Sequence, residues 1–156
     1  MIVSAHHTGF HVADLERSLR FYRDLLGLEV LAQRTITEPY IGELVGYEGV
    51  ELRSAFLRIG HDDHVLELIE YRNVPRTAVD PQSANPGTAH ICLVVEDLPA
   101  VYRLLVEAGT QSISPDLIAP THGPNVGRRV VYMADPDGIR VELLGAELDA
   151  AAQPAS

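Results

Sequence analysis

Hydrophobic and polar positions in the first half of the chain predict one long helix set among strands. Residues 2–12 alternate loosely between the two kinds of residue, as a strand with one buried face does. Asp14 is a suitable N-cap and Gly27 a suitable helix end for the segment between them. The apolar residues of that segment recur at helical spacing, namely Leu15, Leu19, Tyr22 and Leu26. Residues 39–49 are compatible with a short helix, and three further strands are predicted, at 28–36, 51–59 and 64–71.

The second half of the chain repeats this order of elements. A strand is predicted over 88–95 and a helix from Asp97 to Gly109, because apolar residues recur there at helical spacing. Three shorter strands follow, at 111–114, 128–134 and 139–144. The segment 115–127 is rich in proline and glycine and is expected to be a long irregular loop of the kind that often forms a lid. Each half therefore reads β-α-β-β-β, which indicates a duplicated module.

These patterns divide the chain into four segments. We expect a first module over 1–71, a connecting loop over 72–87 that contains three prolines, and a second module over 88–145. The tail, 146–156, has little to bury and is expected to be mobile. A length of 156 residues suits one domain or two small modules that share a core.

Charge and cysteine content limit the partners, the cellular location and the chemistry that we expect for the protein. The formal net charge of -10 argues against binding to nucleic acid or to an anionic membrane surface. No secretory segment or membrane-spanning run is recognisable. Cys92 is the one cysteine and cannot form an intramolecular disulfide, so a cytoplasmic location is expected. All 12 basic residues are arginine, which excludes catalysis by a lysine.

Each module carries a histidine and a glutamate in matching places. His7 and His90 lie in the first strand of their modules, and each is followed seven positions later by Asp-Leu. Glu67 and Glu142 lie in the last strand, and each stands between aliphatic neighbours. A carboxylate in such a strand is costly to bury unless it is paired or bound to a metal, although an exposed edge position is the alternative. Two imidazoles and two carboxylates suffice to bind a divalent metal ion.

The repeated motifs resemble the vicinal oxygen chelate superfamily, which includes glyoxalase I, methylmalonyl-CoA epimerase, extradiol dioxygenases and drug-resistance proteins. The resemblance extends to about Gly145, and it rests on these motifs: His7 with Asp14-Leu15, Ser18-Leu-Arg-Phe-Tyr22 with Leu25-Leu26-Gly27-Leu28, His90 with Asp97-Leu98, and Asp135-Pro-Asp-Gly138 before Glu142. It implies an α+β fold in which two tandem βαβββ modules form a curved mixed sheet around a metal. In glyoxalase I and the epimerase, which are closest in ligand pattern, the matching positions are the ligands, here His7, Glu67, His90 and Glu142.

The resemblance leaves three kinds of function open. The first is proton transfer next to a carbonyl of a small molecule, with Glu67 or Glu142 as the base and nickel, cobalt, manganese, zinc or iron as the metal. The second is ferrous extradiol dioxygenase chemistry, which Tyr132 favours and a fourth ligand at Glu67 disfavours. The third is drug sequestration without a metal, which four intact ligand-type residues disfavour. Relatives commonly pair, so a homodimer is expected.

Seven more residues are candidates for binding substrate or supporting the metal ligands. His11 lies two residues after His7 on the same face of its strand, and His122 lies in the long loop. Tyr132 precedes Glu142 by ten residues, and Arg53 could bind an anionic substrate, as could Arg128, Arg129 and Arg140. For each of them an ordinary solvated or packing role is the alternative.

Overall fold

The computed structural model describes residues 1–146, so the tail predicted over 146–156 lies outside the described residues apart from Ala146. The chain divides into two compact units, a first unit of Met1–Val79 and a second unit of Asp80–Ser156. Each unit contains its own sheet and is described separately below. Within residues 1–146, no helix is long and apolar enough to cross a membrane.

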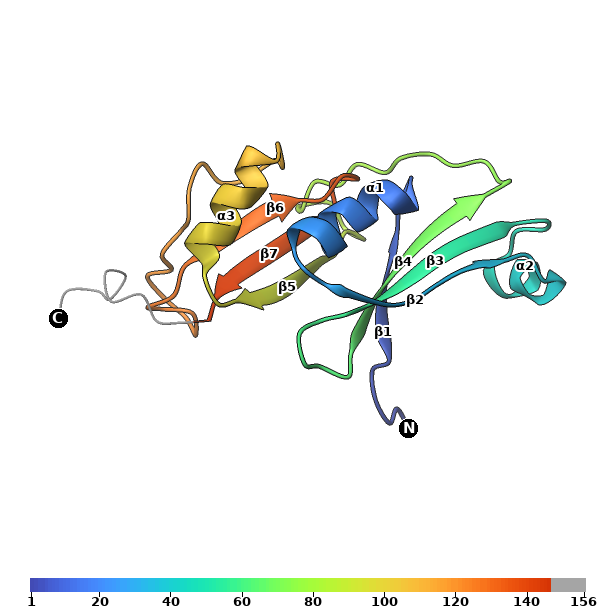
Figure 1. Cartoon of the computed structure of the whole chain (residues 1–156), viewed down its shortest axis with the longest axis horizontal. Coiled ribbons are helices and arrows are strands. Elements are labelled where there is room, and N and C mark those ends of the chain that lie inside the picture. Colours follow the sequence, from blue (N-terminus) through green and yellow to red (C-terminus); the bar gives the residue numbers. More distant parts are fainter. Residues whose placement is uncertain (147–156) are drawn as a thin grey trace. The chain divides into compact units, whose positions relative to one another are not determined.

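The first unit is a four-stranded sheet with one main helix (Figure 1). Its elements are β1 (His7–His11), α1 (Leu15–Leu19), a π-helical continuation (Arg20–Leu25), β2 (Glu29–Ile36), α2 (Pro39–Val45), β3 (Glu51–Arg58) and β4 (Val65–Arg72). The strand order is β1-β4-β3-β2, in which β1 runs parallel to β4 and the other pairs are antiparallel. The first and last strands of the unit are therefore neighbours.

Local sequence explains where the main helix of this unit begins and ends. The Asp14 side chain accepts a hydrogen bond from the Arg17 backbone N–H at 2.9 Å, which is an N-cap contact. Gly27 adopts a φ of 75°, a conformation that favours glycine and ends the helix. Leu15 and Leu19 are fully buried, and α1 contacts β3 and β4, whose Leu57, Leu66 and Leu68 are also fully buried. The predicted helix is confirmed.

The second unit repeats this plan with three strands. Its elements are β5 (His90–Val95), α3 (Leu98–Glu107), β6 (Val130–Ala134) and β7 (Arg140–Gly145). The strand order is β5-β7-β6, with β5 parallel to β7 and β6 antiparallel to it. Asp97 caps α3 through a 3.0 Å hydrogen bond from the Ala100 N–H, and the helix covers one face of the sheet (Figure 1). The predicted α+β fold class is confirmed.

Two strand predictions need correction. The strand predicted at 111–114 is absent, and the edge of β6 meets this region only through isolated bridges, Ser112 with Met133 and Ile118 with Val130. Two backbone bonds join this region to β6, from Ala134 N–H to Gln111 O at 2.9 Å and from Ile113 N–H to Tyr132 O at 2.8 Å. Beyond them the Ser112 and Ser114 hydroxyls donate to the carbonyls of Ser114 and Asp116 at 2.6 and 3.0 Å, and such local bonds favour a bend over a longer strand. The first strand begins at His7 instead of Ile2, because its neighbour β4 begins opposite His7, at Val65.

Candidate functional site

Parallel pairing of β1 with β4 brings together the histidine and glutamate of the first unit, here called the first pair. Gly9 lies opposite Glu67 in the register, and His7 lies two residues earlier on the same face of β1. The His7 Nε2 and Glu67 Oε2 atoms are 3.2 Å apart. The Glu67 side chain is 12% exposed and that of His7 40%, so the imidazole partly shields the carboxylate from water.

The second unit builds its histidine and glutamate, here called the second pair, in the same register. Cys92 lies opposite Glu142, and His90 lies two residues earlier, as His7 does relative to Gly9. The His90 Nε2 and Glu142 Oε2 atoms are 3.3 Å apart, and the Glu142 side chain is 15% exposed. Both units therefore present one imidazole nitrogen and one carboxylate oxygen with nearly equal spacing.

The third strand of each sheet adds a different aromatic ring. Phe56 of β3 lies opposite Glu67, and its ring meets that of His7 edge-on with centroids 5.8 Å apart. Tyr132 of β6 lies opposite Glu142, and its ring lies 5.4 Å from that of His90. Only the second ring carries a hydroxyl, so the two pairs differ in hydrogen bonding.

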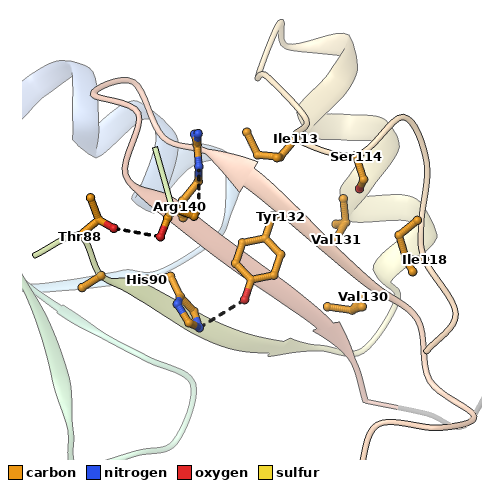
Figure 2. Close-up of a pocket in the computed structure, with 11 residues that line it drawn as sticks. Thr88, His90, Ile113, Ser114, Ile118, Val130, Val131, Tyr132 and Arg140 are labelled. Atoms are coloured by element: carbon orange, nitrogen blue, oxygen red, sulfur yellow. Dashed lines mark hydrogen bonds between the residues drawn. The ribbon is translucent and has the colours of Figure 1, made fainter. Parts of the chain in front are cut away.

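The Tyr132 hydroxyl connects the two members of the second pair. It donates to Glu142 Oε2 at 2.8 Å. It also lies 3.4 Å from His90 Nε2, a contact that Figure 2 shows. Partial burial, together with the adjacent Glu142 carboxylate, raises the pKa of Tyr132 to about 12. The phenol is therefore protonated at neutral pH and available as a donor to the carboxylate.

The donor atoms of both pairs suit a divalent metal. Two ligand atoms about 2.1 Å from one ion, at an angle of 90° to 110°, lie roughly 3.0 to 3.4 Å apart. The Nε2 to Oε2 distances of 3.2 and 3.3 Å fall in that range. His6 Nδ1 and His7 Nδ1 are 2.8 Å apart, and a proton on His7 Nδ1 leaves its Nε2 lone pair for a metal.

Neither pair is a complete metal site. Within either unit, the described residues hold no group of three or more His, Cys, Asp or Glu side chains placed to bind an ion. A resident ion bound by two protein ligands alone would be weakly held compared with the three or four ligands usual in such sites. Each pair is therefore one half of the donor set identified in the sequence.

The other candidate residues have varied surroundings. His11 is exposed on the face of β1 that carries His7, and its ring contacts that of Tyr71 at 5.1 Å. His122 is exposed, and its Nδ1 lies 3.0 Å from the Thr121 hydroxyl. Arg53 lies opposite Glu70, three residues from Glu67 and so on the other face of β4. There it forms ion pairs with Glu70 at 3.3 Å and Glu16 at 3.0 Å.

Two features of the second unit were not identified from the sequence. One is the hydrogen bond from Tyr132 to Glu142, which antiparallel pairing of β6 with β7 creates. The other is a cavity of about 620 Å³ that both Tyr132 and His90 line, together with Arg140 (Figure 2). Arg140 precedes Glu142 by two residues, so strand alternation could have placed it on the same face.

Comparisons with a family model and with known proteins agree on one family. The model of the Glyoxalase/Bleomycin resistance protein/Dioxygenase superfamily matches residues 4–143. The 2-epi-5-epi-valiolone epimerase of an Actinomyces species is 29% identical over 145 residues, which cover 91% of this chain and 79% of that protein. The probable lactoylglutathione lyase of a Synechocystis strain is 28% identical over 140 residues, covering 88% of this chain and 92% of that protein.

Solved structures agree with this result. A glyoxalase family protein from Bacillus cereus matches with a TM-score of 0.81 and 16% identity, covering 93% of this chain and 95% of that one. That likeness concerns the fold alone. The trypanothione-dependent glyoxalase I of Leishmania major matches with a TM-score of 0.64 and 25% identity, covering 92% of this chain and 87% of that one.

Proposed function

The chain belongs to the Glyoxalase/Bleomycin resistance protein/Dioxygenase superfamily, and we propose that it is an enzyme that transfers a proton next to a carbonyl group of a small molecule, using one divalent metal ion. The observation that carries this proposal is the repetition of one His–Glu pair in the same register in both units. The relatives named above are an epimerase and a lyase, and proton transfer next to a carbonyl can serve both classes of reaction.

In this proposal the metal is held by both pairs, that is by Nε2 of His7 and His90 and by Oε2 of Glu67 and Glu142. When bound, the ion supplies Lewis-acid stabilisation of negative charge on the carbonyl oxygen of the substrate. The donor set suits nickel, cobalt, manganese, zinc or iron. The four ligands come either from one chain or from modules of two chains in a symmetric homodimer.

In this proposal the side chains transfer the proton and orient the base. Glu67 or Glu142 removes the proton next to the carbonyl and returns it, since a carboxylate can act first as base and then as acid. Tyr132 orients the Glu142 carboxylate through its 2.8 Å hydrogen bond. We propose a cytoplasmic location, in keeping with the single cysteine.

A ferrous extradiol dioxygenase is the second candidate, and Tyr132 favours it. The Tyr132 hydroxyl lies within hydrogen-bonding reach of both His90 and Glu142, so it would be placed to give a proton to a group bound beside them. Glu67 disfavours this candidate, because a fourth ligand would fill a position that a catechol and oxygen require.

Metal analysis and two reactivity assays separate the candidates. The protein should be purified without added metal and its metal content measured. The control is the His61→Ala variant, which removes a histidine from the exposed turn before β4 and should hold as much metal as the wild type. Proton-transfer chemistry predicts exchange of substrate protons with solvent deuterium in α-hydroxy ketones or thioesters, without oxygen uptake. Oxygen consumption with catechols and no exchange would establish the dioxygenase instead.

A further inference from the structure

The cavity beside the second pair combines apolar walls with a single cationic side chain. It lies entirely in the second unit and has a volume of about 620 Å³. Figure 2 shows Ile113, Ile118 and Val130 on one side and Arg140 on the other, with Tyr132 between them in this view and His90 below. A volume of this size suits a small organic molecule, and mainly apolar walls with few polar groups are typical of ligand pockets.

Arg140 is buried, with 7% of the residue exposed, and Asp135 at 5% is the other buried charged residue among those of this unit that the structure describes. Its guanidinium donates to three neutral oxygens, Ser83 Oγ at 3.3 Å, Gly138 O at 3.3 Å and Gln82 Oε1 at 3.5 Å. These bonds are long for N–H···O contacts, and a guanidinium has five N–H donors. Arg140 therefore keeps donor capacity for a further acceptor, and its buried charge gains from an anion.

The first unit has no counterpart of this cation. Arg140 lies opposite His90 in the parallel register, and the residue in the same relation to His7 is Val65. The fold is built equally well with an aliphatic residue at that place, so strand pairing does not require an arginine there. The arginine therefore belongs to the chemistry of the second unit and of its cavity.

We propose that Arg140 makes this cavity the binding site for an anionic oxygen group, a carboxylate or a phosphate, carried on an apolar body. The proposal rests on the proposed function, since it names the substrate class of the same site. The anion contacts the guanidinium, which matches both groups with two parallel hydrogen bonds. The apolar body lies against Ile113, Ile118 and Val130, and this arrangement brings the rest of the molecule to His90 and Tyr132.

The overall charge of the protein makes a local cation necessary for such a ligand. The chain carries a formal net charge of -10, so its general field repels anions. A buried guanidinium acts at short range and is poorly screened by salt. Binding of the anion should consequently depend on this one residue much more than on the surface arginines.

Probe binding to the full chain tests the proposal in metal-free and metal-loaded samples. The probes are phenylacetate, phenyl phosphate and the neutral analogue phenylacetamide. At least one anion should bind the metal-free chain about tenfold or more tightly than the amide does, as an ionic hydrogen-bonded contact provides. Preference for phenylacetate or for phenyl phosphate identifies the anionic group.

Three variants test whether the preference for the anion over the amide depends on Arg140. Arg140→Gln should abolish the preference for the anion, and Arg140→Lys should retain part of it. Arg103→Gln, which removes the same charge from an exposed position on α3, should leave it unchanged. Equal binding of anion and amide, or an unchanged preference in Arg140→Gln, overturns the proposal.

A spectroscopic measurement keeps the test decisive if Arg140→Gln does not fold. The side-chain N–H signals of Arg140 in the wild-type chain should shift with the anion and stay unchanged with the amide; shifts confined to other arginines overturn the proposal. Metal content of the same samples separates the proposed anion site at Arg140 from the proposed metal-dependent function. Stoichiometric metal without anion preference contradicts only the Arg140 site, whereas Arg140-dependent binding without any metal affinity contradicts only the metal-dependent function.

Discussion

The first pair stands beside a phenylalanine and the second beside a tyrosine, although the strands hold both pairs in one register. Phe56 packs against the His7 ring and offers no hydrogen bond to Glu67. Tyr132 packs against His90 in a similar way and also donates to Glu142 at 2.8 Å. The backbone therefore fixes the spacing of the donor atoms, while the third strand determines how tightly each carboxylate is oriented.

Removal of either histidine should have the largest effect, because it tests whether the two pairs act as one site. We expect His7→Ala and His90→Ala each to abolish stoichiometric metal binding, since one pair alone supplies only two ligands. Metal content per chain is the measurement, with His61→Ala as the control that retains the ion. Unchanged metal content in both variants would show that the pairs do not hold a metal.

Neutralising a carboxylate should affect turnover next most strongly. Glu142→Gln keeps an oxygen donor but loses basicity, so turnover should fall by about 10²-fold or more, with a smaller loss of metal affinity than in His90→Ala. Glu67→Gln made in parallel shows which pair supplies the base. The control is Glu107→Gln, on the exposed side of α3. Full deuterium exchange in both pair variants would exclude a carboxylate base.

Replacing Tyr132 with phenylalanine, the residue type beside the first pair, tests the difference between the pairs directly. Tyr132→Phe makes the second pair resemble the first and should lower metal affinity or turnover by roughly tenfold, as loss of a hydrogen bond to a ligand typically does. Tyr102→Phe removes a hydroxyl that donates to the Pro115 carbonyl in the same unit and should have no such effect. If the two variants behave alike, the hydroxyl of Tyr132 has no special role.

Alkaline titration of Tyr132 examines the same hydrogen bond through the pKa of the phenol. Because burial and Glu142 raise the pKa of Tyr132 to about 12, the folded state favours the neutral phenol. Its contribution to stability is present below the ordinary tyrosine pKa of about 10 and is lost as pH rises through about 12. The difference in phenolate absorbance between wild type and Tyr132→Phe, followed as a function of pH, measures the pKa of Tyr132. A midpoint near 10 would contradict the raised pKa.

The smallest effect concerns the residue between the members of each pair, Gly9 in the first and Cys92 in the second. Cys92 is an exposed residue, but partial desolvation of its sulfur, together with the Glu142 carboxylate, raises the pKa of its thiol. Alkylation at pH 8 should therefore be slower than for free cysteine, by several-fold, and should become faster in Glu142→Gln. Equal rates in wild type and Glu142→Gln would show that the carboxylate does not act on the thiol.

The sequence predicted most of the helices and strands and the four residues of the two pairs, since periodicity and the His to Asp-Leu spacing are local signals. It failed at residues 111–114, where pairing with β6 is limited to an isolated bridge at Ser112 and the serine hydroxyls bond to nearby carbonyls. It also gave no indication that Arg53 joins an ion-pair network on the far face of β4 or that Arg140 is buried. Those properties depend on which residues oppose one another across strands, and pairing partners lie far apart in the chain.

The parallel pairing of first and last strands also determines when each pair can assemble during folding. His7 and Glu67 are separated by 60 positions in the chain and His90 and Glu142 by 52, so each contact closes nearly an entire module. Such contacts carry a large loop-closure cost and form slowly compared with hairpins. We therefore expect the chain to acquire the proposed metal ion after the sheets have formed, so that chelators would remove the ion without unfolding the protein.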